Sequence, residues 1–213
     1  MGEVGVGFKP RPRIQTLSDL IFGFALSIGA LTLIGTQPAN FLAVSEALLF
    51  YGFSFLVLIG VWRSYSTILS ILPVETEFLT NLNIVLLFTV SIEPYLFNQL
   101  FSVQGDFWNN ISILYAVDLA VMFLILAFFN HSLAKEEKGY VPKGFLRKFR
   151  FERNYDLVAA AIFGASALPL FQFPVSVATH DVPIRAFIWI SALLLGMLRR
   201  RFPIQKQTNQ TPQ

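Results

Sequence analysis

The sequence contains no cysteine and few charged residues. Only 14% of its 213 residues are charged, whereas soluble domains typically carry about a quarter. The absence of cysteine excludes disulfides, thiolate nucleophiles and cysteine-based metal sites. The two histidines, His131 and His180, fall in connections expected on opposite sides of the fold, and no histidine–carboxylate cluster has metal-ligand spacing. The sequence therefore does not predict an enzyme and predicts no cofactor.

Long apolar runs take up most of the chain, which is 54% hydrophobic. A helix that crosses about 30 Å of hydrocarbon needs ~20 mostly apolar residues. Such runs are too long, and alternate too little, to be strands. We predict an all-α integral membrane protein with six transmembrane helices, over residues 17–35, 42–62, 79–97, 111–129, 157–173 and 184–198.

The distribution of lysine and arginine predicts the orientation. Of the 16 basic residues, all except Arg185 precede the first span, lie in the connections after the second and fourth spans, or follow the sixth. Because cytoplasmic loops are enriched in lysine and arginine, both termini are predicted to be cytoplasmic. Residues 1–12 are then an N-terminal arm, residues 13–202 the six-helix transmembrane domain, and residues 203–213 a disordered cytoplasmic tail.

The longest cytoplasmic connection, EEKGYVPKGFLRKFRFERNYD at residues 136–156, mixes basic and aromatic residues. This composition is typical of an interfacial helix that lies against anionic lipid headgroups. Ordinary membrane anchoring explains its positive charge. We therefore predict that the lipid bilayer is a partner of this chain and that nucleic acid is not.

Three acidic residues lie inside the predicted spans, where a charge is costly and usually faces protein or water. Glu93 precedes Pro94 near an outer end, so its carboxylate is expected at the membrane interface. Glu46 lies about one turn into its span and is expected to reach the same side. Asp118 is deeper and needs a hydrogen-bond partner, such as a Tyr, Ser or Asn of a neighbouring helix; a proton-relay role is the alternative.

The segment RIQTLSDLIFGFALSIGALTL, residues 13–33, carries a cation, Arg13, at its start and an anion, Asp19, six positions later. After Asp19 it is almost wholly apolar. Six residues span about 9 Å along a helix, so these two side chains are expected to reach neighbouring helices. The alternative is a simple N-terminal cap, because Ser18 and Asp19 also suit a helix start with its unpaired N–H groups.

This segment resembles the Arg-x-x-x-Phe-Ser-Asp signature and first helix of the transmembrane-protein-175-type potassium channels. RIQTLSD followed by IFGFALSIGALTL carries the likeness, with Leu17 in place of the signature phenylalanine. Trp62 resembles the tryptophan that ends the family's second span, and Asn83 resembles an asparagine in its third. The histidine that often follows the tryptophan is absent, and Tyr65 and Ser66 lie there instead. The resemblance implies a structural polar network of Arg13, Ser18, Asp19, Trp62 and Asn83.

The resemblance also implies a homo-oligomer, a tetramer, in which four first helices surround a pore closed by apolar rings. Its pore-lining positions fall here on Phe24, Ser27, Ile28 and Leu31. Spacings of four and seven place Phe24, Ile28 and Leu31 on one helical face, with Ser27 at its edge. From the residues alone, such a face can equally be buried or face lipid.

We therefore predict a passive monovalent-cation channel that favours potassium, the permeant ion, in a prokaryotic cell membrane. Phe24 makes a larger plug than an isoleucine would, and a hydrophobic constriction excludes ions by dewetting. The alternative is a non-conducting integral membrane protein with a structural or binding role. A secondary transporter ranks third, because the prolines lie nearer span ends than mid-membrane.

Overall fold

The computed structural model describes residues 13–35, 41–72, 76–102, 106–135, 143–177 and 180–199. The predicted arm (1–12) and tail (203–213) lie outside these ranges. The described elements are the helices α1 (Arg13–Gly35), α2 (Phe41–Leu69), α3 (Glu77–Ser102), α4 (Asp106–Ala134), α5 (Lys143–Ser166) and α6 (Ile184–Arg199), the 3-10 turn η2 (Pro169–Phe171), and the strands β1 (Pro174–Val177) and β2 (His180–Pro183).

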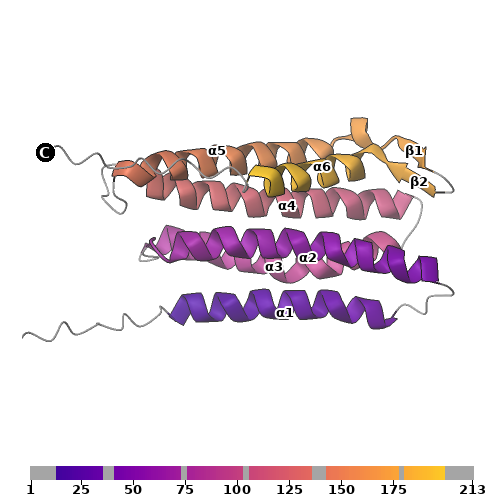
Figure 1. Cartoon of the computed structure of the whole chain (residues 1–213), viewed down its shortest axis with the longest axis horizontal. Coiled ribbons are helices and arrows are strands. Elements are labelled where there is room, and N and C mark those ends of the chain that lie inside the picture. The colour runs from indigo at the N-terminus through magenta and orange to yellow at the C-terminus, as the bar shows by residue number, and fades with distance from the viewer. Residues whose placement is uncertain are drawn as a thin grey trace, which may run out of the picture.

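The six helices lie along one common axis and form successive layers (Figure 1). Helix α1 forms one edge and packs against α2 and α3, α3 packs against α4, and α4 packs against α5 over most of its length. Helix α6 covers the opposite side, against α5 and part of α2. Among the described residues, helix α1 therefore has protein on one side only.

Helix α4 contributes a continuous stripe of side chains to the core of the bundle. Its apolar residues recur on one face with alternating spacings of four and three. These spacings keep side chains on one stripe of a helix. The stripe is fully buried and consists of Tyr115, Leu119, Met122, Leu126, Phe129 and Leu133. Stacked rings of Phe123 and Phe163, with centroids 5.5 Å apart, fix α5 against α4.

Four of the described helices, α1 to α4, contain a stretch long and apolar enough to cross a membrane. This supports the predicted class of helical integral membrane protein. The fifth predicted span, residues 157–173, is wrong in its bounds, because α5 begins at Lys143 and ends at Ser166. Residues 143–156 of the basic connection, which suited an interfacial helix, form the first half of α5. Helix α6 carries a shorter apolar stretch, Ile184–Leu194.

The connection between α5 and α6 contains an antiparallel two-stranded hairpin, which the sequence analysis did not predict. Its register pairs Val175 with Val182 and Ser176 with Asp181. Valine favours extended backbone because of its β-branch, so three valines within eight residues are consistent with this outcome. The hairpin caps the end of the bundle at which α6 begins (Figure 1).

Candidate pore helix and its anchoring network

The predicted pore-lining side chains lie on the open face of α1. Phe24 is 67% exposed, Ile28 45% and Leu31 60%, and Ser27 is exposed as well. The face continues toward the helix start through Leu17 and Leu20. Within the described part of the chain, these apolar side chains are left for lipid or for another subunit to cover.

The opposite face of α1 is packed tightly against the bundle. Phe22 and Ala25 are each 1% exposed, and the Phe22 ring lies 5.6 Å from the ring of Tyr65 in α2. A Cβ placed on Gly29 would lie 3.4 Å from the ring of Tyr51, so a side chain here would meet α2. The first helix is therefore oriented by its small and buried residues, which direct Phe24 outward.

Polar contacts fix the first two turns of α1 to α2 and α3. The indole Nε1 of Trp62 donates to Oδ1 of Asp19 at 3.0 Å. The hydroxyls of Ser18 and Tyr65 lie 2.6 Å apart, and Tyr65 also donates to Oδ1 of Asn83. The structure thus places Ser18, Asp19, Trp62 and Asn83 in one region, whereas the side chain of Arg13 lies outside the described residues.

Tyr65 is the member of this network that sequence reasoning missed. It was noted only as lying where the resembling channels often have a histidine. In the structure it is fully buried and connects Ser18 of α1 to Asn83 of α3. The signal available in the sequence was its spacing of three residues from Trp62, which places both side chains on the same side of α2.

Replacing Tyr65 with phenylalanine is expected to loosen α1 while keeping the aromatic packing. Loss of the hydroxyl leaves the buried amide oxygen of Asn83 without this donor, which costs about 1–3 kcal/mol. Thermal melting of the purified protein in detergent measures the loss. Tyr95→Phe, at an exposed tyrosine of α3, is the matched control and should melt like wild type. Equal melting of both variants would show that the Tyr65 hydroxyl contributes nothing.

A second polar cluster lies deeper in the bundle, around Glu93 of α3. The expectation that this carboxylate lies at the membrane interface is wrong, because Glu93 is fully buried. Its two oxygens accept bonds from the hydroxyl of Ser54 at 3.0 Å each, and Tyr115 donates to Oε1 at 3.0 Å. Helix α3 continues past Pro94, so Glu93 faces α2 and α4 instead of ending a span.

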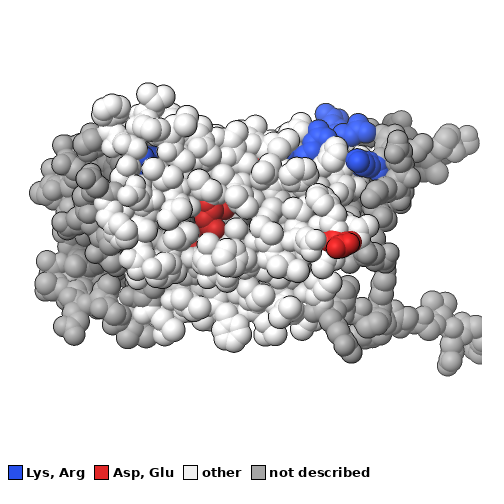
Figure 2. All heavy atoms as spheres, turned by 180° about the vertical axis from the view of Figure 1, so that it is seen from behind, with Lys and Arg blue, Asp and Glu red and all other residues white. Residues whose placement is uncertain are grey.

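Among the residues that the structure describes, Asp118 lacks the hydrogen-bond partner that was predicted for it. It is 5% exposed, and neither carboxylate oxygen has a hydrogen-bond partner within the described residues. Figure 2 shows one group of acidic atoms at mid-length of the bundle and a second one nearer the end where most of the visible lysines and arginines gather. The side chain of Glu46 lies outside the described residues.

Arg185, the basic residue that departed from the sequence pattern, is buried at the start of α6. Its Nη1 donates to the hydroxyl of Ser112 at 2.7 Å, and its Nε donates to the carbonyl of Phe171 at 3.5 Å. This arginine therefore attaches α6 to α4 instead of marking a cytoplasmic loop.

Within the described residues, no group of three or more His, Asp or Glu is arranged to hold a metal ion.

One family model matches the part of the chain that begins with α1. Residues 13–94 match the family model described as the endosomal/lysosomal potassium channel TMEM175. The resemblance to the TMEM175-type channels is confirmed. The match covers α1, α2 and α3 as far as Pro94, and so includes the α1 face and the Ser18–Tyr65–Asn83 contacts. No curated protein matches the chain.

The fold extends this similarity to the remaining helices. The chain is similar to the crystal structure of a lysosomal potassium-selective channel TMEM175 homolog from Chamaesiphon minutus, with a TM-score of 0.60. The two sequences are 16% identical, and the alignment covers 89% of this chain and 97% of that one. At this identity the comparison establishes the fold of nearly the whole chain.

Proposed function

We propose that this chain is a passive potassium-favouring cation channel in which α1 of each subunit lines a central pore. The observation that carries the proposal is the two-sided character of α1. One side is fixed to α2 and α3 by Phe22, Ala25 and the Asp19–Trp62 hydrogen bond. The other presents Phe24, Ile28 and Leu31 outward, in a segment that matches the TMEM175 family.

The proposed assembly is a homotetramer whose α1 helices pack around one axis. An exposed apolar stripe on an edge helix is where a second copy would bury surface. Residues 13–202 form the channel domain in this proposal, with both termini in the cytoplasm of a prokaryotic cell. The gathering of lysine and arginine near the end of the bundle where α5 begins supports that orientation (Figure 2).

Phe24, Ser27, Ile28 and Leu31 form the proposed constriction. Rings of apolar side chains block ions by keeping water out, so small changes in their diameter control conduction. No covalent chemistry and no cofactor are needed. The potassium ion is the permeant species and would shed part of its hydration shell at this point.

Oligomeric state and flux test the proposal together. Purified full-length protein in mild detergent is expected to be a tetramer, and liposomes loaded with potassium should release it once the protein is reconstituted. A stable monomer, or tetramers that conduct no potassium at any voltage or pH, would contradict the proposal. The second outcome would favour a non-conducting membrane protein, for which the bulk of Phe24 is the argument. Uphill transport driven by a second ion would instead indicate a secondary transporter.

Ser27→Ala is expected to reduce the preference for potassium over sodium with little change in current. The Ser27 hydroxyl donates to the carbonyl of Gly23 at 2.8 Å, which leaves its oxygen lone pairs as acceptors for a cation. Reversal potentials under potassium and sodium gradients measure the preference. Ser91→Ala is the matched control, since this exposed serine of α3 makes the same kind of bond to Phe88. Equal selectivity in both variants would exclude Ser27 as a ligand.

A further inference from the structure

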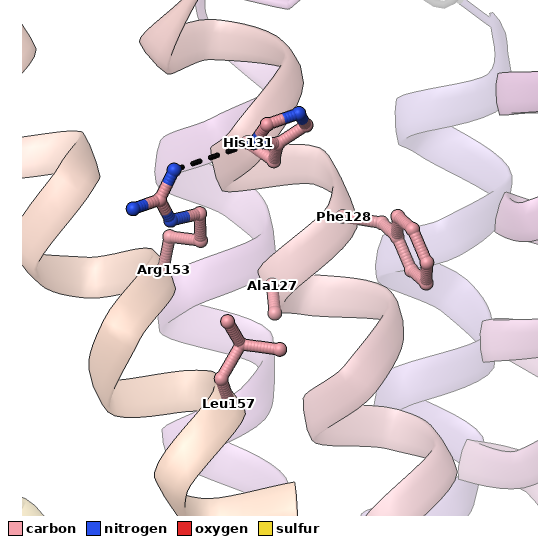
Figure 3. A pocket seen from close by; sticks show the side chains of 5 residues that line it. All are labelled: Ala127, Phe128, His131, Arg153 and Leu157. Atoms are coloured by element: carbon pink, nitrogen blue, oxygen red, sulfur yellow. Dashed lines mark hydrogen bonds between the residues drawn. The ribbon is translucent and has the colours of Figure 1, made fainter.

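A groove on the outer surface of α4 and α5 has no role in the proposed pore. It has a volume of about 260 Å³ and is lined by Ala127, Phe128, His131, Arg153 and Leu157. Figure 3 shows Ala127 and His131 of α4 beside Arg153 and Leu157 of α5, with the ring of Phe128 directed away from α5. Phe128 and Leu157 are each nearly half exposed, and His131 is exposed, so the groove opens outward from the bundle.

The groove is apolar along its length and polar at one end. His131 follows Ala127 by one helical turn in α4, and Arg153 precedes Leu157 by one turn in α5. Because the two helices run in opposite directions, both polar residues lie at the same end. There Nη1 of Arg153 lies 3.4 Å from Nδ1 of His131 (Figure 3).

The polar end carries the positive charge of Arg153, which within the described residues hydrogen-bonds to His131 and Asn154. Besides His131, the guanidinium of Arg153 donates to Oδ1 of Asn154, from Nε at 3.1 Å and from Nη2 at 2.8 Å. The same half of α5 exposes Arg147, Lys148 and Arg150. The field at this end therefore attracts anions.

The depth of the Arg153–His131 pair matches a lipid headgroup. The apolar stretch of α4 runs from Phe107 to Ala134, so His131 lies within its last turn, where hydrocarbon gives way to headgroups. On the other side of the pair, Ala127, Phe128 and Leu157 extend toward the hydrocarbon. A ligand that fits must therefore have an anionic head joined to an apolar chain.

We propose that this groove binds one anionic phospholipid, with its phosphate on Arg153 and His131 and its acyl chain along Ala127, Phe128 and Leu157. Arginine suits a phosphate because its planar fork offers several donors at once. A zwitterionic lipid brings its own cation next to the phosphate, which weakens the attraction to a basic end. The bound lipid bridges α4 and α5 independently of whether the chain conducts ions.

Native mass spectrometry of the purified full chain, titrated with phosphatidylglycerol or phosphatidylcholine, tests the charge requirement. A basic residue near an anionic lipid contributes enough that Arg153→Gln should weaken phosphatidylglycerol binding roughly fivefold, with phosphatidylcholine unaffected. Arg147→Gln removes the same charge from the same helix outside the groove and should change binding less than twofold. Equal losses in both variants would show a diffuse field and overturn the site, as would no loss in Arg153→Gln.

A large side chain placed in the apolar part of the groove tests whether an acyl chain binds there. Leu157→Trp should reduce binding of phosphatidylglycerol while leaving Arg153 in place, whereas Val158→Trp, at the adjacent exposed position of α5, should not. Equal behaviour of the two tryptophan variants would contradict an acyl chain in this groove. Excess inorganic phosphate should fail to displace the lipid, since it lacks the chain; displacement would identify a free-anion site instead.

Discussion

Phe24→Ala is expected to raise the potassium flux through reconstituted protein several-fold and to loosen its preference for potassium over sodium. Truncating four rings at one level of a pore widens the constriction and lets water enter, which lowers the barrier to a partly hydrated cation. Because Phe24 is 67% exposed within its own chain, the loss of intrachain packing should be small. Liposome flux and thermal melting measured on the same preparation check both statements.

Phe22→Ala is the matched control, two residues away on the buried face. Phe22 is 1% exposed and packs against Tyr65, so its truncation should cost about 3–5 kcal/mol of stability without any gain of flux. The account fails if Phe24→Ala behaves like Phe22→Ala. In that case the open face of α1 would be buried in a non-conducting interface.

Glu93→Ala is expected to be the most destabilising change in the deeper polar cluster. The hydroxyls of Ser54 and Tyr115 both donate to this carboxylate, and each loses its acceptor. A buried polar group left unsatisfied costs about 1–3 kcal/mol, so the two together should cost about 2–6 kcal/mol. Thermal melting in detergent measures the effect.

Glu93→Gln separates hydrogen bonding from charge at the same position. Its amide keeps one acceptor oxygen for Ser54 or Tyr115, so the loss of stability should be clearly smaller than in Glu93→Ala. If the two variants melt alike and well below wild type, the negative charge itself stabilises the bundle. If both melt like wild type, the cluster contributes nothing.

The four apolar helices were predictable because their composition indicates that they lie in the hydrocarbon of a membrane. Continuous apolar runs of about 20 residues have one stable environment, and the structure has helices at all four of the first predicted spans. The start of α5 was not predictable in the same way. Its basic residues are compatible with a surface helix, and only burial of Leu146 and Phe149 shows that it is continuous with the packed part of α5.

The polar interior was predicted less well, because hydropathy does not say which way a side chain turns. Glu93 and Asp118 lie on faces that depend on how α2, α3 and α4 pack. The interface position expected for Glu93 is wrong, and Asp118 lacks the expected hydrogen-bond partner within the described residues. The residues proposed for the network around α1 came from resemblance to a known signature and not from physics. Tyr65 was missed there, since its spacing from Trp62 gives only its side of α2, whereas its role depends on contacts with Ser18 of α1 and Asn83 of α3.

The pore-lining role of α1 is tested most directly by cysteine accessibility, for which the cysteine-free sequence is suited without further change. Leu31→Cys in potassium-loaded liposomes should react with a charged, water-soluble thiol reagent, and the modified channel should lose most of its flux. Phe88→Cys, on an exposed face of α3, should conduct equally before and after the reagent. Unchanged flux through fully modified Leu31→Cys would contradict the account.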